Sequence, residues 1–417
     1  MPRGSLWWAE LIDMTEMVGN RHGSVAAIKY DTERAAASRT APMPISAIDR
    51  AAWRDLAARA IEPNGYYLPE WELAVSASAR GRAGADVLTA PTATSRFTPG
   101  QLLGLLPVVS LWRAYRIPLP ALVSADPYGS LEVPLLDGRY AIDAAATLLN
   151  AARTNGARAL LLRNLTLDGK VFDAFAKAGA RDGIAPLILQ SHARACLDAT
   201  QDAERLLRDA LGAKKLKELR RQHNRLAEHG AVAFEVASSP SDVSRALESF
   251  LALEASGWKA RRGTALAQHD GDARFIRTAT GALAAHGQCQ IVTLRAGARA
   301  VAAGIVLRHQ DRAFFFKLGI DETFARCSPG VQLTLELTRH LCADPAITAA
   351  DSTAAPGHPM IDPIWRGRLP IGDVLIPLRR DDTVVAAIRS ALALRTALRA
   401  NARRALHAIR QVRETSS

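Results

Sequence analysis

The clearest alternation of apolar and polar stretches lies in the last third of the chain. Two apolar runs, residues 301–308 and 313–320, are separated by only four polar residues, which is the spacing of a β-hairpin with two buried strands. A turn follows, and residues 331–340 show helical spacing of apolar positions. Ser328 is a residue type that caps helices, and Pro329 is well tolerated in a first helical turn. The pattern therefore predicts strand, strand, turn and helix, in that order.

The start of this predicted helix is suited to an anion. The first backbone N–H groups of a helix are unpaired, and that end carries about half a positive charge. Gly330 has no side chain to keep a ligand away from the main chain. The turn therefore suits a pyrophosphate, although Ser-Pro-Gly also serves simply to begin a helix.

The first half of the chain repeats the order of patterns seen in the second half. Strand, helix and strand patterns recur at an offset of roughly 190 to 200 residues, which matches Gly104 with Gly304. The matching segments are 102–111, 142–152 and 159–163 in the first half, and 301–307, 331–341 and 347–351 in the second. We interpret the repeat as two copies of one mixed α/β unit. Only the second copy has Ser-Pro-Gly before its helix, so the phosphate argument applies only there.

The chain ends in a predicted amphipathic helix that begins after Arg380. Apolar residues recur at three- and four-residue spacing, with arginines next to them. The apolar positions are Ala391, Leu394, Leu398, Ala402, Ala405, Ile409 and Val412, and the arginines are Arg395, Arg399, Arg403, Arg410 and Arg413. Two interpretations compete. The stripe packs on the body of the protein or on a partner chain, or it lies on an anionic membrane surface.

Length and composition indicate a two-domain globular protein. At 417 residues the chain is too long for one ordinary core, and 48% of its residues are apolar. No apolar run reaches the roughly 18 residues of a membrane span. The start of the chain has no long apolar core and carries Glu10 and Asp13, so it does not resemble a secretory signal. We expect a soluble protein of the cytoplasm, with no transmembrane segment.

The net charge of +12 is unevenly spread along the chain. One share lies in residues 205–225, and another lies in the tail from Arg379 onward. A solvated basic face, attraction to anionic cofactors or substrates, and nucleic-acid binding are the three interpretations of this charge. The four cysteines are scattered without the spacing of a zinc site or of a disulfide framework, so we expect no metal.

Several short motifs occur in an order that resembles a known family. They are Leu253-Glu-Ala-Ser-Gly-Trp-Lys259, Gly263-Thr-Ala-Leu266, Ser328-Pro-Gly330, Ala350-Asp-Ser352 and Gly357-His-Pro-Met-Ile-Asp-Pro-Ile-Trp365. Together they resemble the acetyltransferase domain of CelD-like proteins, which belongs to the GNAT superfamily and is related to the Fem-type transferases. The resemblance is strong over residues 200–378. It is fainter over residues 47–200, where its best signs are Glu62-Pro-Asn64 and Pro127-Tyr-Gly129.

The resemblance implies an α/β fold with a mixed sheet, built as two tandem GNAT-like domains plus a C-terminal amphipathic helix. Fem-type transferases also carry two such units per chain. The expected division is an N-terminal arm and linker at 1–44, a first, degenerate GNAT-like domain at 45–200, a second GNAT-like acetyltransferase domain at 201–378, and a basic C-terminal helix at 379–417.

The resemblance also implies an activity. The expected enzyme is an N-acyltransferase that moves an acyl group, with acetyl as the leading candidate, from acyl-CoA to an amine of a small molecule or of an envelope polysaccharide precursor. The pyrophosphate of the donor is expected at Ser328, Pro329, Gly330 and Gln332. The familiar Gln/Arg-x-x-Gly-x-Gly/Ala phosphate signature is absent, so a different donor stays open.

This chemistry requires a base for the amine, a group that polarises the thioester carbonyl, and aligned reactants. The candidate bases are Glu254, Asp351 and His358, and Lys317 is a candidate for polarising the carbonyl or binding a carboxylate. Structural roles are open as well, since these carboxylates also suit ion pairs and loop caps. The candidate substrate contacts are Trp258, Lys259, Trp365 and Tyr128.

Two other functions compete with this one. The first is a Fem-type transfer from aminoacyl-tRNA, in which the basic cluster at 214–225 serves the tRNA. Apart from that tRNA, we do not expect nucleic acid as a partner. The second is a non-catalytic accessory role in polysaccharide biosynthesis, with the C-terminal helix as the docking element. Peripheral membrane contact through this helix belongs to the same set of hypotheses.

Overall fold

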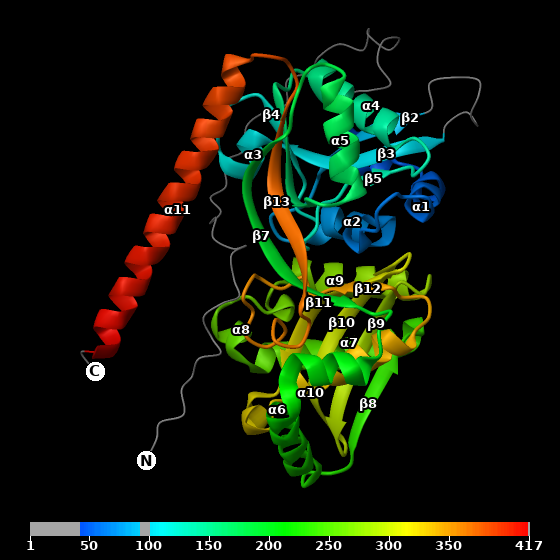
Figure 1. Ribbon diagram of the computed structural model, residues 1–417, viewed down its shortest axis with the longest axis vertical. Helices are drawn as coiled ribbons and strands as arrows, with labels where there is room; N and C mark the ends of the chain where they lie inside the picture. The colour runs from blue at the N-terminus through cyan, green and yellow to red at the C-terminus, as the bar shows by residue number, and fades with distance from the viewer. Residues whose placement is uncertain (1–41, 92–100, 416–417) are drawn as a thin grey trace.

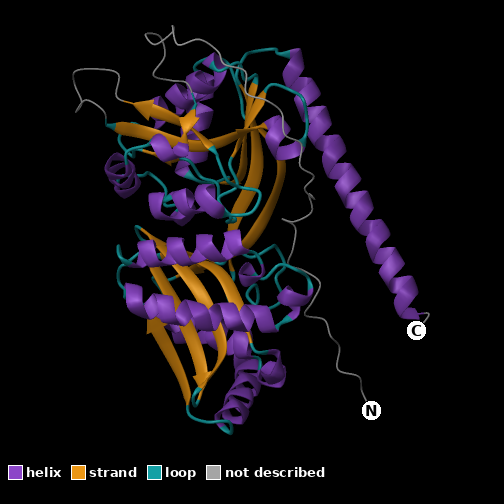
Figure 2. Cartoon of the chain, turned by 180° about the vertical axis from the view of Figure 1, so that it is seen from behind, coloured by secondary structure: helices purple, strands orange, loops and turns teal. Residues whose placement is uncertain are grey.

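The computed structural model describes residues 42–91 and 101–415, with side chains described up to residue 402 and at residue 404. The expected N-terminal arm therefore lies almost entirely outside the described residues. Figure 1 shows a body of two parts, formed mainly by the first and the second half of the chain, with one long helix beside it. Seen from behind, helices cover the sheet in both parts (Figure 2).

Thirteen strands form one mixed sheet in the described part of the chain. They are β1 (Met43–Pro44), β2 (Asp86–Pro91), β3 (Leu102–Ser110), β4 (Ala121–Ser124), β5 (Leu135–Leu136), β6 (Ala159–Thr166), β7 (Leu187–Asp198), β8 (Val232–Ala237), β9 (Cys289–Ala296), β10 (Arg299–His309), β11 (Arg312–Ile320), β12 (Ala349–Asp351) and β13 (Gly367–Pro377). Together with the helices that cover it, this sheet confirms the predicted mixed α/β fold.

The α-helices are interspersed among the strands along the chain. They are α1 (Arg50–Ala58), α2 (Pro69–Ser78), α3 (Leu111–Tyr115), α4 (Ala141–Thr154), α5 (Lys170–Ala180), α6 (Ala203–Ala227), α7 (Pro240–Ser256), α8 (Trp258–Arg261), α9 (Asp270–Ala284), α10 (Pro329–Ala343) and α11 (Thr383–Thr415). The helices predicted at 142–152 and 331–340 are confirmed as α4 and α10. None of the helices described is both long and apolar enough to cross a bilayer.

The predicted hairpin is confirmed as β10 and β11. These strands pair antiparallel, with Ala302 opposite Ile320 at one end. β12 runs parallel to β11 over three residue pairs and ends at Asp351, opposite Phe314. β12 ends there, whereas β11 continues to Ile320, so the pairing of the two parallel strands stops at this point.

The order of the strands in the sheet is β1-β2-β3-β4-β6-β13-β7-β12-β11-β10-β9-β8. From either end the sheet follows the same plan, with β1 matched to β8, β2 to β9, β3 to β10, β4 to β11 and β6 to β12. β4 and β6 are parallel, as are β11 and β12. Gly104 and Gly304 lie on the corresponding strands β3 and β10. This symmetry supports the interpretation of a duplicated unit.

The two central strands link the halves. β13 pairs with β6 on one side and with β7 on the other, although it is the last of the described strands along the chain. β7 comes from the first half and reaches β12 through residues 196–198. Both are long curved strands that run between the two parts of the body in Figure 1. The proposed domains at 45–200 and 201–378 therefore meet through this strand pair.

One hydrophobic core crosses the junction between the halves. It includes Tyr66 and Trp71 from the first half and Phe275 and Phe314 from the second. The ring centroids of Tyr66 and Phe314 are 5.7 Å apart, and those of Trp71 and Phe275 are 4.9 Å apart, both pairs edge to face. A second core lies under α6 and α10. Packing in this shared core holds the two halves together and so fixes the positions of the residues of the site.

Candidate functional site

Glu254 is a buried carboxylate held between two lysines. It lies near the end of α7 and is only 2% exposed. Its Oε1 is 3.2 Å from Lys259 Nζ and 3.4 Å from Lys317 Nζ. Its Oε2 accepts a 2.9 Å hydrogen bond from the backbone N–H of Leu266. A carboxylate is stable at such depth because these partners replace water.

Two opposing effects act on the pKa of Glu254. Burial raises the pKa, whereas the positive charges of Lys317 and Lys259 and the N–H of Leu266 lower it more, so the pKa lies below its ordinary value. The group is therefore ionised at neutral pH. A carboxylate with a lowered pKa is a weak base, so this geometry suits Glu254 to hold two ammonium groups in place.

A bulge in β11 turns Lys317 toward the junction of the halves. The register against β10 shifts between Phe315 and Lys317, so Phe316 is one extra residue in the strand. Phe316 and Lys317 consequently both reach the ring of Tyr128. The Phe316 ring centroid lies 6.5 Å from that ring, and Lys317 Nζ lies 5.9 Å from it.

Tyr128 brings the first half of the chain into the cluster. Its hydroxyl donates a 3.2 Å hydrogen bond to Asp272 Oδ2 on α9. The guanidinium of Arg82 lies 4.2 Å from the centre of its ring. The structure thus brings together four of the predicted site residues, which are Glu254, Lys259, Lys317 and Tyr128.

Trp258 lies at the rim of this cluster, at the start of α8. Its backbone N–H donates a 2.7 Å hydrogen bond to Glu322 Oε1. Its ring lies 5.0 Å from the guanidinium of Arg262 and 6.0 Å from Lys259 Nζ. The half-buried ring therefore forms a wall beside the lysines.

His358 lies in the loop after β12 and is half-buried. Burial lowers its pKa, and the charge of Lys259 adds to this effect, although Asp362 opposes it. The ring is therefore neutral at pH 7. Its Nδ1 accepts a 3.3 Å hydrogen bond from the N–H of Met360, which leaves the proton of the neutral ring on Nε2. The nitrogen that remains is a donor, suited to polarising a carbonyl oxygen.

The start of α10 differs from the prediction. Ser328 is the cap residue, but its backbone is left-handed, with φ 49° and ψ 55°, and its side chain caps no N–H of the first turn. A Cβ on Gly330 would lie 3.1 Å from both Leu318 Cδ2 and Met360 Sδ, and 3.3 Å from Ile320 Cγ2. The glycine is therefore required for close packing of the helix start on β11 and on the His358 loop. The expectation that it gives a ligand free access to the main chain is corrected.

Three other predicted residues have side chains that serve the fold. Pro329 is buried in the first turn of α10, as the sequence predicted for its position. Gln332 is buried and donates a 2.8 Å hydrogen bond to the Leu219 carbonyl of α6. Trp365 is 1% exposed and donates a 2.9 Å hydrogen bond to Thr338 Oγ1. Gln332 and Trp365 thus contact α6 and the second core, away from the Glu254 cluster.

Asp351 belongs to a separate polar group at the end of β12. It forms a buried ion pair with Arg194 of β7, and Arg194 also donates to the Ser130 carbonyl at 2.5 Å. One buried atom of this group, Arg194 Nε, has no hydrogen-bond partner in the part of the chain that the structure describes. Burial raises the pKa of Tyr66, and the nearby Asp351 raises it further. Arg194 and Tyr66 were not predicted, because Asp351 lies more than a hundred residues from each of them in sequence.

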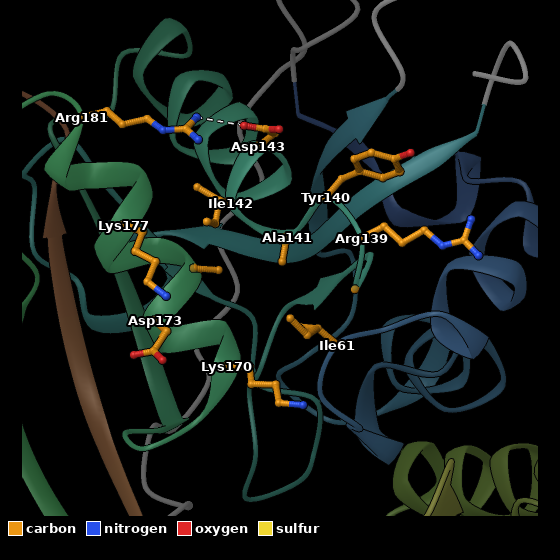
Figure 3. A pocket seen from close by; sticks show the side chains of 12 residues that line it. Ile61, Arg139, Tyr140, Ala141, Ile142, Asp143, Lys170, Asp173, Lys177 and Arg181 are labelled. Carbon is orange, nitrogen blue, oxygen red and sulfur yellow. Dashed lines mark hydrogen bonds and ion pairs between the residues drawn. The ribbon is translucent and has the colours of Figure 1, made fainter. Parts of the chain in front are cut away.

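An open cavity of about 320 Å³ lies in the first half, at the starts of α4 and α5 (Figure 3). Its lining includes four basic side chains, those of Arg139, Lys170, Lys177 and Arg181, and two acidic ones, those of Asp143 and Asp173. Arg181 pairs with Asp143 at 2.9 Å.

Glu62 already binds the first turn of α5. Its Oε2 accepts a 3.2 Å hydrogen bond from the N–H of Val171. By the symmetry of the sheet, α4 is the counterpart of α10.

A family comparison defines the class of the second half. Residues 213–355 match the family model described as an acetyltransferase (GNAT) domain. The match includes Glu254, Lys317 and the start of α10, and fewer than half of the residues of the chain fall in it. Residues 213–355 are therefore similar to a GNAT acetyltransferase domain, as the resemblance implied. The narrower likeness to CelD-like proteins stays a prediction.

Comparison with other proteins extends the likeness in fold. FemX has a TM-score of 0.53 at 10% identity, and the match covers 79% of this chain and 96% of that one. The C-terminal domain of a putative lysylphosphatidylglycerol synthetase from Agrobacterium fabrum has a TM-score of 0.49 at 14% identity, over 82% and 95% of the two chains. No curated protein matches this sequence. The FemX likeness supports one shared fold across both halves, and identity this low shows the fold alone.

Proposed function

We propose that the protein is a cytoplasmic N-acyltransferase that moves an acyl group from acyl-CoA to an amine of a small molecule or of an envelope polysaccharide precursor. The main support is the place of the cluster formed by Glu254, Lys259 and Lys317. It lies inside the stretch that matches the GNAT family, just beyond the point where β11 and β12 part, and it faces Tyr128 of the first half. Acetyl is the leading candidate for the acyl group.

The cluster suits the charge that develops during acyl transfer. The amine nitrogen attacks the thioester carbonyl carbon, negative charge grows on the carbonyl oxygen, and the C–S bond breaks to release a thiolate. The proton lost by the amine balances that thiolate. Lys317 offers positive charge to the oxygen, and Glu254 holds Lys317 in position.

The predicted phosphate site at the start of α10 fits the donor only after a movement. Leu318, Ile320 and Met360 cover Gly330, and Met360 belongs to the loop that carries His358. We infer that donor binding lifts this loop from the helix start. Met360→Ala removes part of the cover, so it should raise the affinity for CoA. Isothermal titration calorimetry with CoA measures this directly.

The cavity in the first half provides the matched control. Lys170→Glu changes the charge there without touching α10. If the phosphates bind at α10, Lys170→Glu leaves the affinity unchanged while Met360→Ala raises it. If Lys170→Glu changes the affinity for CoA and Met360→Ala does not, the donor binds in the first half. Absence of CoA binding by the wild type and by both variants would overturn the proposed donor.

Activity is tested by the release of free thiol from acetyl-CoA with a panel of amines. Lys317→Met should lower turnover by about a hundred-fold, the usual cost of removing one donor to a developing oxyanion. Lys317→Arg keeps the charge and should retain more activity. Equal turnover in all three proteins would remove Lys317 from the reaction.

Transfer from aminoacyl-tRNA is a second candidate, favoured by the basic face of α6. Six exposed basic side chains of this helix have no ion-pair partner among the described residues, and they are Arg208, Lys214, Lys217, Arg220, Arg221 and Arg225. α6 touches the start of α10 through the hydrogen bond from Gln332 to Leu219. A polyanionic donor would therefore meet both surfaces together.

A double variant of α6 distinguishes aminoacyl-tRNA from acetyl-CoA as the donor. Lys217→Glu with Arg221→Glu should lower transfer from aminoacyl-tRNA and leave transfer from acetyl-CoA unchanged. A ligand at 100 times its Kd stabilises a fold by about 2.7 kcal/mol, so the melting temperature reports binding of either donor. If neither donor raises it, a non-catalytic accessory role gains support.

A further inference from the structure

The first turns of α11 attach it to the body, and the rest of the helix leaves the body. Val385, Ile388 and Leu392 pack on the apolar residues of β4, β6 and β13. Arg395 still contacts Tyr115 of the body, and most of the helix stands apart from the two-part body in both views (Figures 1 and 2). Three residues after Leu392, on the same side of the helix, the chain has Arg395 instead of an apolar residue. The body-facing stripe thus ends where the projecting segment, residues 393–415, begins.

A second apolar stripe begins on another side of the helix. Leu394 and Leu398 are 61% and 59% exposed, and they are four residues apart, so they form one ridge. Four large apolar side chains of the described residues are more than half exposed, and the other two are Trp112 and Ile188. The two neighbouring leucines give the projecting helix an exposed apolar ridge, which suits a partner with an apolar surface.

Trp112 extends this apolar surface onto the body. It lies on α3, three residues before Tyr115, so the two side chains share one side of that short helix. The guanidinium of Arg395 on α11 lies 3.8 Å from the centre of the Tyr115 ring. Trp112 is therefore close to the point where the projecting segment leaves the body. Tryptophan beside arginine is typical of the interface between water and lipid.

The charge of α11 selects the kind of partner. Between Thr383 and Arg413 the chain has seven arginines and no aspartate or glutamate. A second copy of this helix would place arginines against arginines, so self-association is opposed by repulsion. Nucleic acid would use the arginines but leave the leucines exposed. An anionic lipid surface uses both, because the leucines enter the acyl region while the arginines meet the head groups.

We propose that the projecting segment of α11 is a peripheral membrane-binding element that lies on anionic phospholipid. Leu394 and Leu398 enter the bilayer surface, and Arg399 and Arg404 contact the lipid phosphates. Membrane binding by α11 is independent of the donor and acceptor proposed above. It places the body at the surface where an envelope precursor would be found.

The test is cosedimentation of the full-length protein with vesicles. One set contains equal parts of phosphatidylglycerol and phosphatidylcholine, and the other contains phosphatidylcholine alone. The wild-type protein should bind the anionic vesicles, bind the neutral ones at least about ten-fold more weakly, and lose affinity as salt rises. Equal binding to both sets, or to neither, overturns the proposal.

Paired variants separate the stripe from general charge. Leu394→Glu with Leu398→Glu should weaken binding to anionic vesicles by at least about ten-fold. Ala393→Glu with Ala397→Glu adds the same charges at the same spacing, one position along the helix and off the stripe, and should weaken binding much less. Equal loss in both pairs would show that charge alone governs binding and would overturn insertion of the leucines.

Two further outcomes identify other occupants. Light scattering without vesicles reports a second copy, and a dimer that the leucine pair dissociates would overturn the membrane proposal. Binding of duplex DNA that survives the leucine pair but is lost when Arg399 and Arg404 are replaced with glutamate, with no binding to vesicles, would assign the segment to nucleic acid instead. Retained circular dichroism of every variant shows that the helix content is unchanged.

Discussion

Replacing Glu254 with glutamine tests whether this carboxylate organises the two lysines of the site. Glutamine keeps the shape and can still accept the hydrogen bond of Leu266. It removes the negative charge 3.2 and 3.4 Å from Lys259 and Lys317. Breaking a fully buried ion pair costs about 3–5 kcal/mol. The two lysine side chains keep 17% and 21% exposure, so water takes over part of their solvation, and we expect a loss of about 2 kcal/mol.

Urea unfolding followed by tryptophan fluorescence measures this loss, and pH identifies its origin. The pKa of Glu254 is lowered in the folded protein from an ordinary value of 4.5. Its contribution to stability is therefore full above pH 4.5 and is lost as the pH falls through the lower folded pKa. The difference between wild type and Glu254→Gln should accordingly be full at pH 7 and smaller at a pH well below 4.5.

A double variant completes the test. Lys317→Met in the Glu254→Gln background removes one of the two unpaired ammonium groups, so the double variant should be more stable than the sum of the single changes by about 1 kcal/mol. Wild-type stability in Glu254→Gln at pH 7 would refute the idea that the carboxylate holds the lysines. A difference that is the same at both pH values would assign the loss to packing.

Three further predictions address the surrounding residues. Gly330→Ala should destabilise the fold by about 1–3 kcal/mol, because the new Cβ would lie 3.1 Å from Leu318 and Met360; urea unfolding checks this, and an unchanged midpoint would contradict the close packing. Asp351→Asn should cost about 3–5 kcal/mol by leaving the charge of Arg194 unpaired, and a loss below 1 kcal/mol would show that water reaches that arginine. The NMR titration midpoint of His358 should lie below 6.5 and should rise in a variant without the Lys259 charge; a midpoint above 6.5 would contradict a neutral ring.

Local patterns in the sequence were sufficient for the elements that frame the site. The hairpin of β10 and β11, the helix α10 and the helix α4 each follow from apolar spacing that is complete within one element. The Pro329 position follows from the chemistry of a first helical turn. The repeat between the halves was visible for the same reason, since it concerns the order of elements and not their contacts.

Contacts between distant segments were not predictable in this way. The purpose of Gly330 depends on Met360, which reaches it from a loop thirty residues later. The pairing of β13 with β6 joins strands about two hundred residues apart, and the sequence contains no turn or periodicity that marks it. The partners Arg194 and Tyr66 of the Asp351 group were missed because neither lies near it in the chain.

The sequence by itself determined the elements, the duplication hypothesis and the residue types from which a site could be built, because periodicity and turn chemistry act over a few residues. Only the tertiary structure decided which candidates meet. One extra residue in β11 turns Lys317 toward Glu254 and Tyr128, while Trp365 and Gln332 face another core. Strand register and the packing of one half on the other set these positions, and both depend on residues far apart in the chain.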